Sequence, residues 1–274
     1  MDKLINKIKS SIPLKSRILF SYLKNINHNP YTLRANFSSI TNISDFFIWD
    51  QDCYSMGFIA ENIRSLLMGH KVDITHNFKF FNPEGELLDH QSFETDEFFK
   101  KISFSKINSK CKYISFIHYV ESEINIKEIL KRKGIRRSLK FCEQNRGYTI
   151  YYPNDLISGA IVHGNFGGIS KDLKKTAQQT FLKHNYTPIY RFDKDLEYDL
   201  VFNNPTSKNL IIEIIFNNSL KTIVLSIPTM GTRFIRIKNY TGSISFSSKL
   251  PICRALIFKN PTKNINRNFD VFHS

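Results

Sequence analysis

The segment whose residue types are best suited to contact a ligand is Val162–Gly168, with the sequence VHGNFGG. Its three glycines let a backbone approach a ligand closely, and His163 can donate, accept or transfer a proton. Asn165 adds an amide group that can form hydrogen bonds. The segment lacks the GKS, GKT and GxGxxG patterns of phosphate-binding loops. It therefore predicts either a ligand-contacting loop or a tight turn after a strand.

A second polar segment, Cys142–Tyr148 (CEQNRGY), precedes it in the chain. Glu143, Asn145 and Arg146 could hydrogen-bond a sugar or hold a carboxylate, because the arginine fork matches planar anions. Tyr148 begins a predicted strand and offers a ring. The alternative interpretation is a solvated loop, where these residue types are common.

These two segments flank the predicted strands Tyr148–Tyr152 and Ala160–His163. If the two strands form a hairpin, their outer ends lie together, and so do the two polar segments. The sequence therefore predicts one ligand-binding site without a cofactor or a metal. Its residues are Glu143, Asn145, Arg146, Tyr148, His163 and Asn165.

A basic run spans residues 127–140, in a chain of 274 residues with a formal net charge of +15. Such a run can bind a polyanion such as nucleic acid, acidic lipid or acidic glycan. Neither a helix-turn-helix nor an RNP motif accompanies it. The alternative is a solvated helix, with the charge reflecting a composition rich in Lys, Asn, Ile, Phe and Tyr. The predicted anion-binding residues are Lys131, Arg132, Lys133, Arg136 and Arg137.

Other chemistry has weaker support in the sequence. His76 and His90 could face each other across a hairpin near Asp73 or Asp89, but no HxH or HExxH spacing supports a metal site. His118 is expected to be a strand histidine with a structural role. The sequence shows no CxxC or GxSxG pattern, and we predict no catalytic residue.

The elements around these residues are predicted to be strands. Hydrophobic residues make up 41% and aromatic residues 14% of the chain, and most of the aromatic residues are Phe and Tyr, which favour strands. An opening strand, a hairpin and a closing strand recur in order, so the pattern indicates two β-rich modules with a ligand groove between them. The paired segments are Asp45–Trp49 and Asp199–Phe202, then Phe78–Phe93 and Ile212–Ile227, then Lys112–Val120 and Ile252–Lys259.

The predicted fold is mostly β, with two tandem β-sandwich-like modules, short inserted helices and a helical connector. A basic helical segment covers residues 1–30, and the modules cover residues 31–120 and 186–274. The connector, with helices and a β-hairpin, covers residues 121–185.

Two helices are predicted within this fold from local sequence patterns. Apolar spacing predicts one over residues 58–68, ended by Gly69. The lysine-rich segment Lys171–His184 is expected to form the other.

The stretch Asn204–Lys259 has a Pro-x-x-Gly-Thr turn at Pro228–Thr232 and a Ser-x-Leu-Pro entry into its last strand. In this it is similar to small β-sandwich recognition modules, including sugar-binding ones. The similarity covers about one-fifth of the chain and implies a fold alone.

The N-terminus has no apolar signal-peptide core, and no apolar run is long enough to span a membrane, so a cytoplasmic location is expected. We predict a non-catalytic protein that recognises a glycan or another polar, possibly anionic, ligand. One alternative is an enzyme acting on a sugar or small polar metabolite, with His163 as general base near Glu143 or Asp52. The other is a polyanion-binding protein that uses residues 127–140. The sequence leaves the oligomeric state open.

Overall fold

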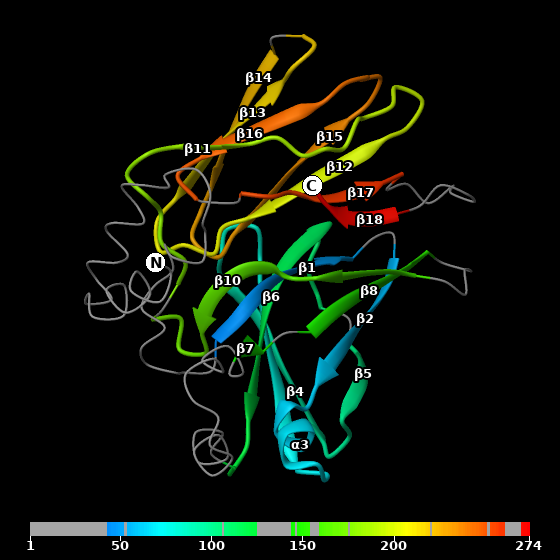
Figure 1. Cartoon of the computed structure of the whole chain (residues 1–274), viewed down its shortest axis with the longest axis vertical. Helices are drawn as coiled ribbons and strands as arrows, with labels where there is room; N and C mark the ends of the chain where they lie inside the picture. The colour runs from blue at the N-terminus through cyan, green and yellow to red at the C-terminus, as the bar shows by residue number, and fades with distance from the viewer. Residues whose placement is uncertain are drawn as a thin grey trace, which may run out of the picture.

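The computed structural model describes most of the chain after residue 42 and shows a fold built mainly from antiparallel sheets (Figure 1). The ranges described are 43–51, 54–105, 107–124, 144–145, 147–153, 159–174, 176–219, 221–250, 253–260 and 270–274. The predictions for residues 1–30, and the basic run at 127–140, lie outside these ranges. None of the helices in the described part of the chain is long and apolar enough to cross a membrane.

The first half of the described chain builds two sheets. Sheet I has the order β10 (Asn165–Ser170), β1 (Ile43–Asp50), β6 (Tyr113–Glu121), β3 (Ile74–Phe81) and β4 (Leu87–Thr95), with β7 (Gln144–Asn145) paired in parallel to β1. Sheet II has the order β5 (Phe99–Ser103), β2 (Tyr54–Glu61), β8 (Gly147–Pro153) and β9 (Ala160–His163). Strands β8, β9 and β10, which come from the expected connector, therefore complete the sheets of β1 and β2.

The second half builds two more sheets. Sheet III has the order β11 (His184–Tyr186), β16 (Ile244–Ser248), β13 (Leu210–Phe216) and β14 (Lys221–Ile227). Sheet IV has the order β15 (Thr232–Ile237), β12 (Tyr198–Asn203), β17 (Leu256–Lys259) and β18 (Asp270–His273). Residues Asp270–His273 therefore pair with β17 as the edge strand of sheet IV.

Alternation of side chains decides how each sheet is covered. In β13, Leu210, Ile212 and Ile214 are fully buried while the residues between them are partly or wholly exposed, so only one face meets the core. All six residues of β12 are buried instead, and so are the first eight of β6. These two strands have neighbours on both faces.

The hydrophobic core forms two large clusters. One lies between sheets I and II and contains many phenylalanine rings, and the other lies between sheets III and IV. Val201 and Phe258 project from the opposite face of sheet IV and belong to the first cluster. The Phe258 ring lies 5.0 Å from the ring of Tyr113 and 5.2 Å from that of Tyr151. Aromatic side chains therefore fill the contact between the two pairs of sheets, where the sequence suggests a ligand groove.

The helix expected over residues 58–68 is half as long in the structure. Helix α3 spans Ile63–Met68; the Asn62 side chain accepts a hydrogen bond from Ser65 N at its start, and Gly69 ends it in the left-handed conformation. Residues 58–61 belong to β2, where Phe58 pairs with strands on both sides. Two flanking strands supply the backbone partners that a helix would otherwise supply, so the prediction for residues 58–61 was wrong.

The prediction of a helix over Lys171–His184 is also wrong for the described residues, which form turns and extended chain. Ala177 N donates to Pro205 O at 3.0 Å, and Thr180 N donates to Lys249 O at 2.8 Å. The backbone at these residues therefore bonds to neighbouring loops and not within a helix.

The repeated order of elements is matched only in part by the topology. The opening strand pairs with the closing strand in both halves, as β1 with β6 and β12 with β17. Hairpin β3–β4 lies in the sheet of β1, whereas hairpin β13–β14 lies in the sheet opposite β12. The two halves therefore share the pairing of the opening with the closing strand but not the place of the hairpin.

Candidate ligand-binding face

Tyr148 and His163 are opposite each other in the β8–β9 hairpin. The sequence predicts this hairpin, and its register places the two side chains on the same face of sheet II. Tyr148 is 38% exposed and His163 is also exposed, whereas Thr149 and Tyr151, on the other face of β8, are buried. The pairing therefore presents a phenol ring and an imidazole side by side to solvent.

The same face continues across β8 towards β2 and β5. The Nζ of Lys101 lies 4.4 Å from the centre of the Tyr152 ring, and this cation–π pair sits above Gly57. A Cβ at Gly57 would come within 3.3 Å of the Lys101 chain and 3.8 Å of the Tyr152 ring, so a larger side chain would crowd the pair. We call this surface the aromatic face. Its residues are Lys101, Tyr148, Tyr152, Ile161 and His163.

His163 is held at one edge of the aromatic face by its neighbours. Its Nδ1 lies 3.0 Å from Gly164 O, and its ring centre lies 4.5 Å from that of His273. Because a carbonyl oxygen only accepts, Nδ1 is the donor, which leaves Nε2 as the acceptor that a ligand hydroxyl can reach. Glu143 and Asp52, the two carboxylates expected near His163 if it is a general base, lie outside the described residues.

His273 comes from β18 and supports the backbone at this edge. Its Nε2 donates to His163 O at 2.7 Å. Burial, with a smaller contribution from Arg254, lowers the pKa of His273 to about 3, so its ring is neutral at ordinary pH. The last strand of the chain therefore fixes the end of β9.

Gly164 allows the sharp passage from β9 in sheet II to β10 in sheet I. A Cβ there would lie 2.7 Å from the Phe47 ring and 2.8 Å from Asp45 Cβ. This close approach of backbone to core explains one of the glycines in the segment Val162–Gly168, and it supports the turn interpretation at that residue.

The other predicted ligand residues are not on the aromatic face or are not described. Asn165 Nδ2 donates to Asn203 Oδ1 at 3.2 Å, so its amide is used in the contact between sheets I and IV. The backbone of Asn145 pairs with Ser44 in sheet I. Residues Glu143 and Arg146, and all five predicted anion-binding residues, lie outside the described residues.

The histidines that the sequence groups around the β3–β4 hairpin do not converge on a metal. His76 Nδ1 contacts His118 Nε2 at 2.8 Å in the core, whereas His90 Nε2 contacts Tyr119 Oη at 3.1 Å. Burial, with a contribution from Arg64, lowers the pKa of His76 to about 4. Burial, with His76 beside it, also holds the pKa of His118 well below 6.5. No group of three or more metal-ligating side chains occurs among the described residues.

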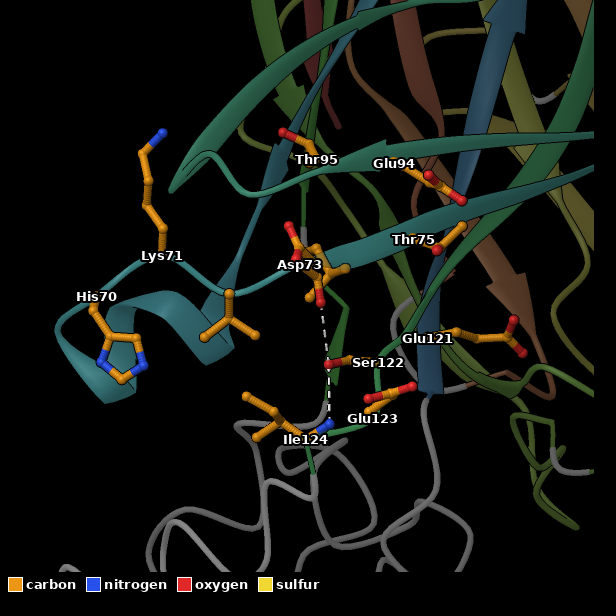
Figure 2. A pocket seen from close by; sticks show the side chains of 12 residues that line it. His70, Lys71, Asp73, Thr75, Glu94, Thr95, Glu121, Ser122, Glu123 and Ile124 are labelled. Atoms are coloured by element: carbon orange, nitrogen blue, oxygen red, sulfur yellow. Dashed lines mark hydrogen bonds between the residues drawn. The ribbon is translucent and has the colours of Figure 1, made fainter.

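A polar hollow of about 890 Å³ opens beside the end of α3. Figure 2 shows the carboxylates of Asp73, Glu94, Glu121 and Glu123 around it, with Ser122 bonded to the backbone of Asp73. Salt bridges join Glu121 to Lys171 and Lys71 to Asp96 nearby. Among the described residues, the one ring at the hollow is the imidazole of His70, and no Phe, Tyr or Trp lines it (Figure 2). Its carboxylates suit a cation.

A buried carboxylate links the two pairs of sheets. Asp199 receives Arg236 in a bidentate pair at 2.7 and 2.8 Å, Lys112 Nζ at 2.7 Å and Tyr113 Oη at 2.8 Å. Burial alone would raise the pKa of Asp199, but the hydrogen bonds from Arg236, Lys112 and Tyr113 outweigh it and hold the pKa below its usual value. This cluster is fully used internally and is structural.

Comparison with known proteins gives little further guidance. No protein-family model matches the chain. A comparison with curated proteins gives no match. Among solved structures, the chain is similar to one containing the M60 catalytic domain with the CBM51-1 and CBM51-2 domains of ZmpB from Clostridium perfringens. The identity is 8% and the TM-score 0.20, and the match covers 76% of this chain and 31% of that one.

Lys101, Tyr152 and His273 were not predicted from the sequence. Tyr152 shares the face of Tyr148 because the two are four residues apart in one strand, and this signal was present in the alternation. Lys101 and His273 arrive through pairings between strands distant in sequence, which no local pattern indicates.

Proposed function

We propose that this protein is a non-catalytic binding protein that recognises a glycan through the aromatic face. The observation that supports it is the pairing of exposed Tyr148 with His163, beside Tyr152 and Lys101 on the same face of sheet II. Aromatic rings pack on the apolar faces of sugar rings, while the imidazole and ammonium groups hydrogen-bond the hydroxyls at their rims. The two pairs of sheets act as two sandwich-like modules, and the first carries this site.

The aromatic face is favoured over the acidic hollow because of its chemistry. The hollow is larger, but its one ring among the described residues is the imidazole of His70, and four of the residues around it are carboxylates. It offers a neutral sugar no phenol or phenyl ring for stacking. The aromatic face combines apolar area with separate donors and acceptors, which is the mixture found in small-molecule sites.

Ligand-dependent thermal stabilisation tests the proposed function. The purified chain is heated with neutral oligosaccharides, nucleotide sugars and short nucleic acids, each at low and high salt. A ligand that binds only the folded state raises stability by about 2.7 kcal/mol at a hundredfold excess over its dissociation constant. We expect a neutral oligosaccharide to raise the Tm equally at both salt concentrations.

Variants connect that shift to the aromatic face. His163→Ala and Tyr148→Ala are expected to abolish the shift while the unliganded Tm changes little, since both side chains are exposed. Val224→Ala, which removes an exposed apolar side chain from sheet III, is the control and should keep the shift. A shift that survives both variants would contradict the proposal. A shift seen only with polyanions at low salt would instead support the basic run at 127–140.

A further inference from the structure

A second, smaller pocket lies in the other half of the molecule, between the segment 177–181, the loop 206–208 and Lys249. Its volume is about 350 Å³, within the range of small-molecule sites, which begins near 300 Å³. It shares no residue with the aromatic face. Whatever it binds is therefore independent of the function proposed above.

The loop on one side of this pocket is fixed by buried polar side chains. Asn204, which is fully buried, donates through Nδ2 to Lys208 O at 2.8 Å and accepts from Thr206 N at 2.9 Å. The Gln179 amide crosses from the opposite segment and donates to Lys208 O at 3.1 Å and Asn209 O at 3.0 Å. The backbone of Lys208 is thus held from two directions.

The other side of the pocket is fixed in the same way. Thr180 donates two hydrogen bonds to Lys249 O, one from its backbone N at 2.8 Å and one from its Oγ1 at 3.0 Å. The backbone carbonyls of Lys208 and Lys249 are therefore both held by hydrogen bonds, and both lysines line this pocket. Neither Lys208 nor Lys249 forms an ion pair with any residue that the structure describes, and both are exposed.

The remaining lining defines what kind of ligand the pocket accepts. No carboxylate lines the pocket among the described residues, and the free polar groups at its wall include the amide of Gln178 and the hydroxyl of Ser207. Phe181 stands at the rim with its side chain 85% exposed. Two cations attract an anion, hydroxyl and amide groups bind polar substituents, and an exposed ring packs on an apolar face.

We propose that this pocket binds a small acidic sugar, with its carboxylate between Lys208 and Lys249 and its ring against Phe181. The acidic hollow beside α3 has the opposite charge and repels such a ligand. The two lysines set the preference for the charged sugar, and Phe181 sets the preference for a sugar ring over a free anion.

Calorimetric titration of the full chain tests this with glucuronate, glucose and inorganic phosphate. Glucuronate is expected to bind and glucose to bind at least about tenfold more weakly, because it lacks the anion. The double variant Lys208→Gln/Lys249→Gln should lose about tenfold or more in glucuronate affinity. The control Lys110→Gln/Lys194→Gln removes the same charge from two exposed lysines elsewhere and should stay within about twofold.

Phe181→Ala separates sugar recognition from simple anion binding. It should weaken glucuronate binding several-fold and leave phosphate binding unchanged. Equal glucuronate affinity in the wild type and the lysine variant would overturn the proposal, and so would no detectable binding of glucuronate. Phosphate binding as tightly as glucuronate would overturn its sugar part. These results do not depend on the aromatic face, because the pocket shares no residue with it. A protein that fails to bind an oligosaccharide at the aromatic face should still bind glucuronate in this pocket.

Discussion

Asp199 is a fully buried carboxylate whose partners come from both pairs of sheets. Asp199→Asn removes the carboxylate that both Arg236 and Lys112 contact. We expect a loss of about 2–3 kcal/mol in the free energy of unfolding, below the usual cost of breaking a buried pair because Arg236 can be partly rehydrated. Urea denaturation measures it.

The matched control is Asp96→Asn, which removes an exposed partner of Lys71. An exposed pair contributes less than about 1 kcal/mol, so the control should be near neutral. Equal effects of the two variants would show that the Asp199 cluster is not a buried network.

The burial of His76 and His118 makes stability depend on pH. The unfolded chain takes up protons on these rings near pH 6.5, but the folded chain protonates His76 only near a pKa of about 4, and His118 also lies well below 6.5. Stability is therefore complete above about pH 6.5 and falls as pH decreases, by up to about 1.4 kcal/mol per pH unit for each ring.

The variant His76→Leu/His118→Leu should reduce this slope between pH 6.5 and 5, measured as urea midpoints at several pH values, and leave the part due to His273, whose pKa is also lowered. Exposed His70→Gln is the control and should keep the wild-type slope. A slope unchanged by the double variant would mean that the pair does not resist protonation in the folded chain.

Among the elements, the turn between β3 and β4 packs against the turn that precedes β15. Gly85 has a φ of +86°, and a Cβ there would lie 1.9 Å from Thr229 O. Thr232 N donates to Pro83 O at 3.1 Å across the same contact. This turn therefore joins sheet I to the second half of the molecule.

Gly85→Ala is expected to destabilise the protein much more than Gly69→Ala. Gly69 also has a positive φ, +76°, but no atom lies within 4 Å of its missing Cβ. Gly69→Ala should cost about 1–2 kcal/mol from backbone conformation alone, and Gly85→Ala should exceed it by the cost of the clash. Thermal unfolding of the two variants measures the difference, and equal losses would contradict the contact.

The hairpins show which strand pairings can be predicted from the sequence. The strands β3–β4, β8–β9 and β13–β14 follow from alternation around local turns, which is why the pairing of Tyr148 with His163 could be predicted. The partners of β8 beyond β9 could not, because β2 and β5 lie far away in sequence. Residues 58–61 were misassigned because Phe58 and Ile59 satisfy a helical and a strand period equally.

At the scale of the whole molecule, strands β12 and β17 at the centre of sheet IV are buried on both faces. One face meets sheet III, and the other places Val201 and Phe258 in the core cluster of sheets I and II. The sequence indicates two separate modules, because each half has its own alternating strands. The sequence does not indicate that Val201, which points away from the side of Leu200, packs into the core of sheets I and II.

This shared sheet predicts one cooperative unfolding transition. Phe258→Ala should cost about 3–5 kcal/mol, since it removes a buried ring that touches Tyr113 and Tyr151. Differential scanning calorimetry should show a single transition for the wild type and, at lower temperature, for the variant. Two resolved transitions would contradict the shared core.

Calorimetric titration of three proteins tests the aromatic face most directly. The wild type, Tyr148→Phe and Tyr148→Ala are titrated with the neutral oligosaccharide that gives the largest thermal shift. Stacking needs the ring and not the hydroxyl, so we predict that Tyr148→Phe binds within a few-fold of the wild type and Tyr148→Ala loses about tenfold or more. Equal affinity of the alanine variant and the wild type would contradict recognition at this face.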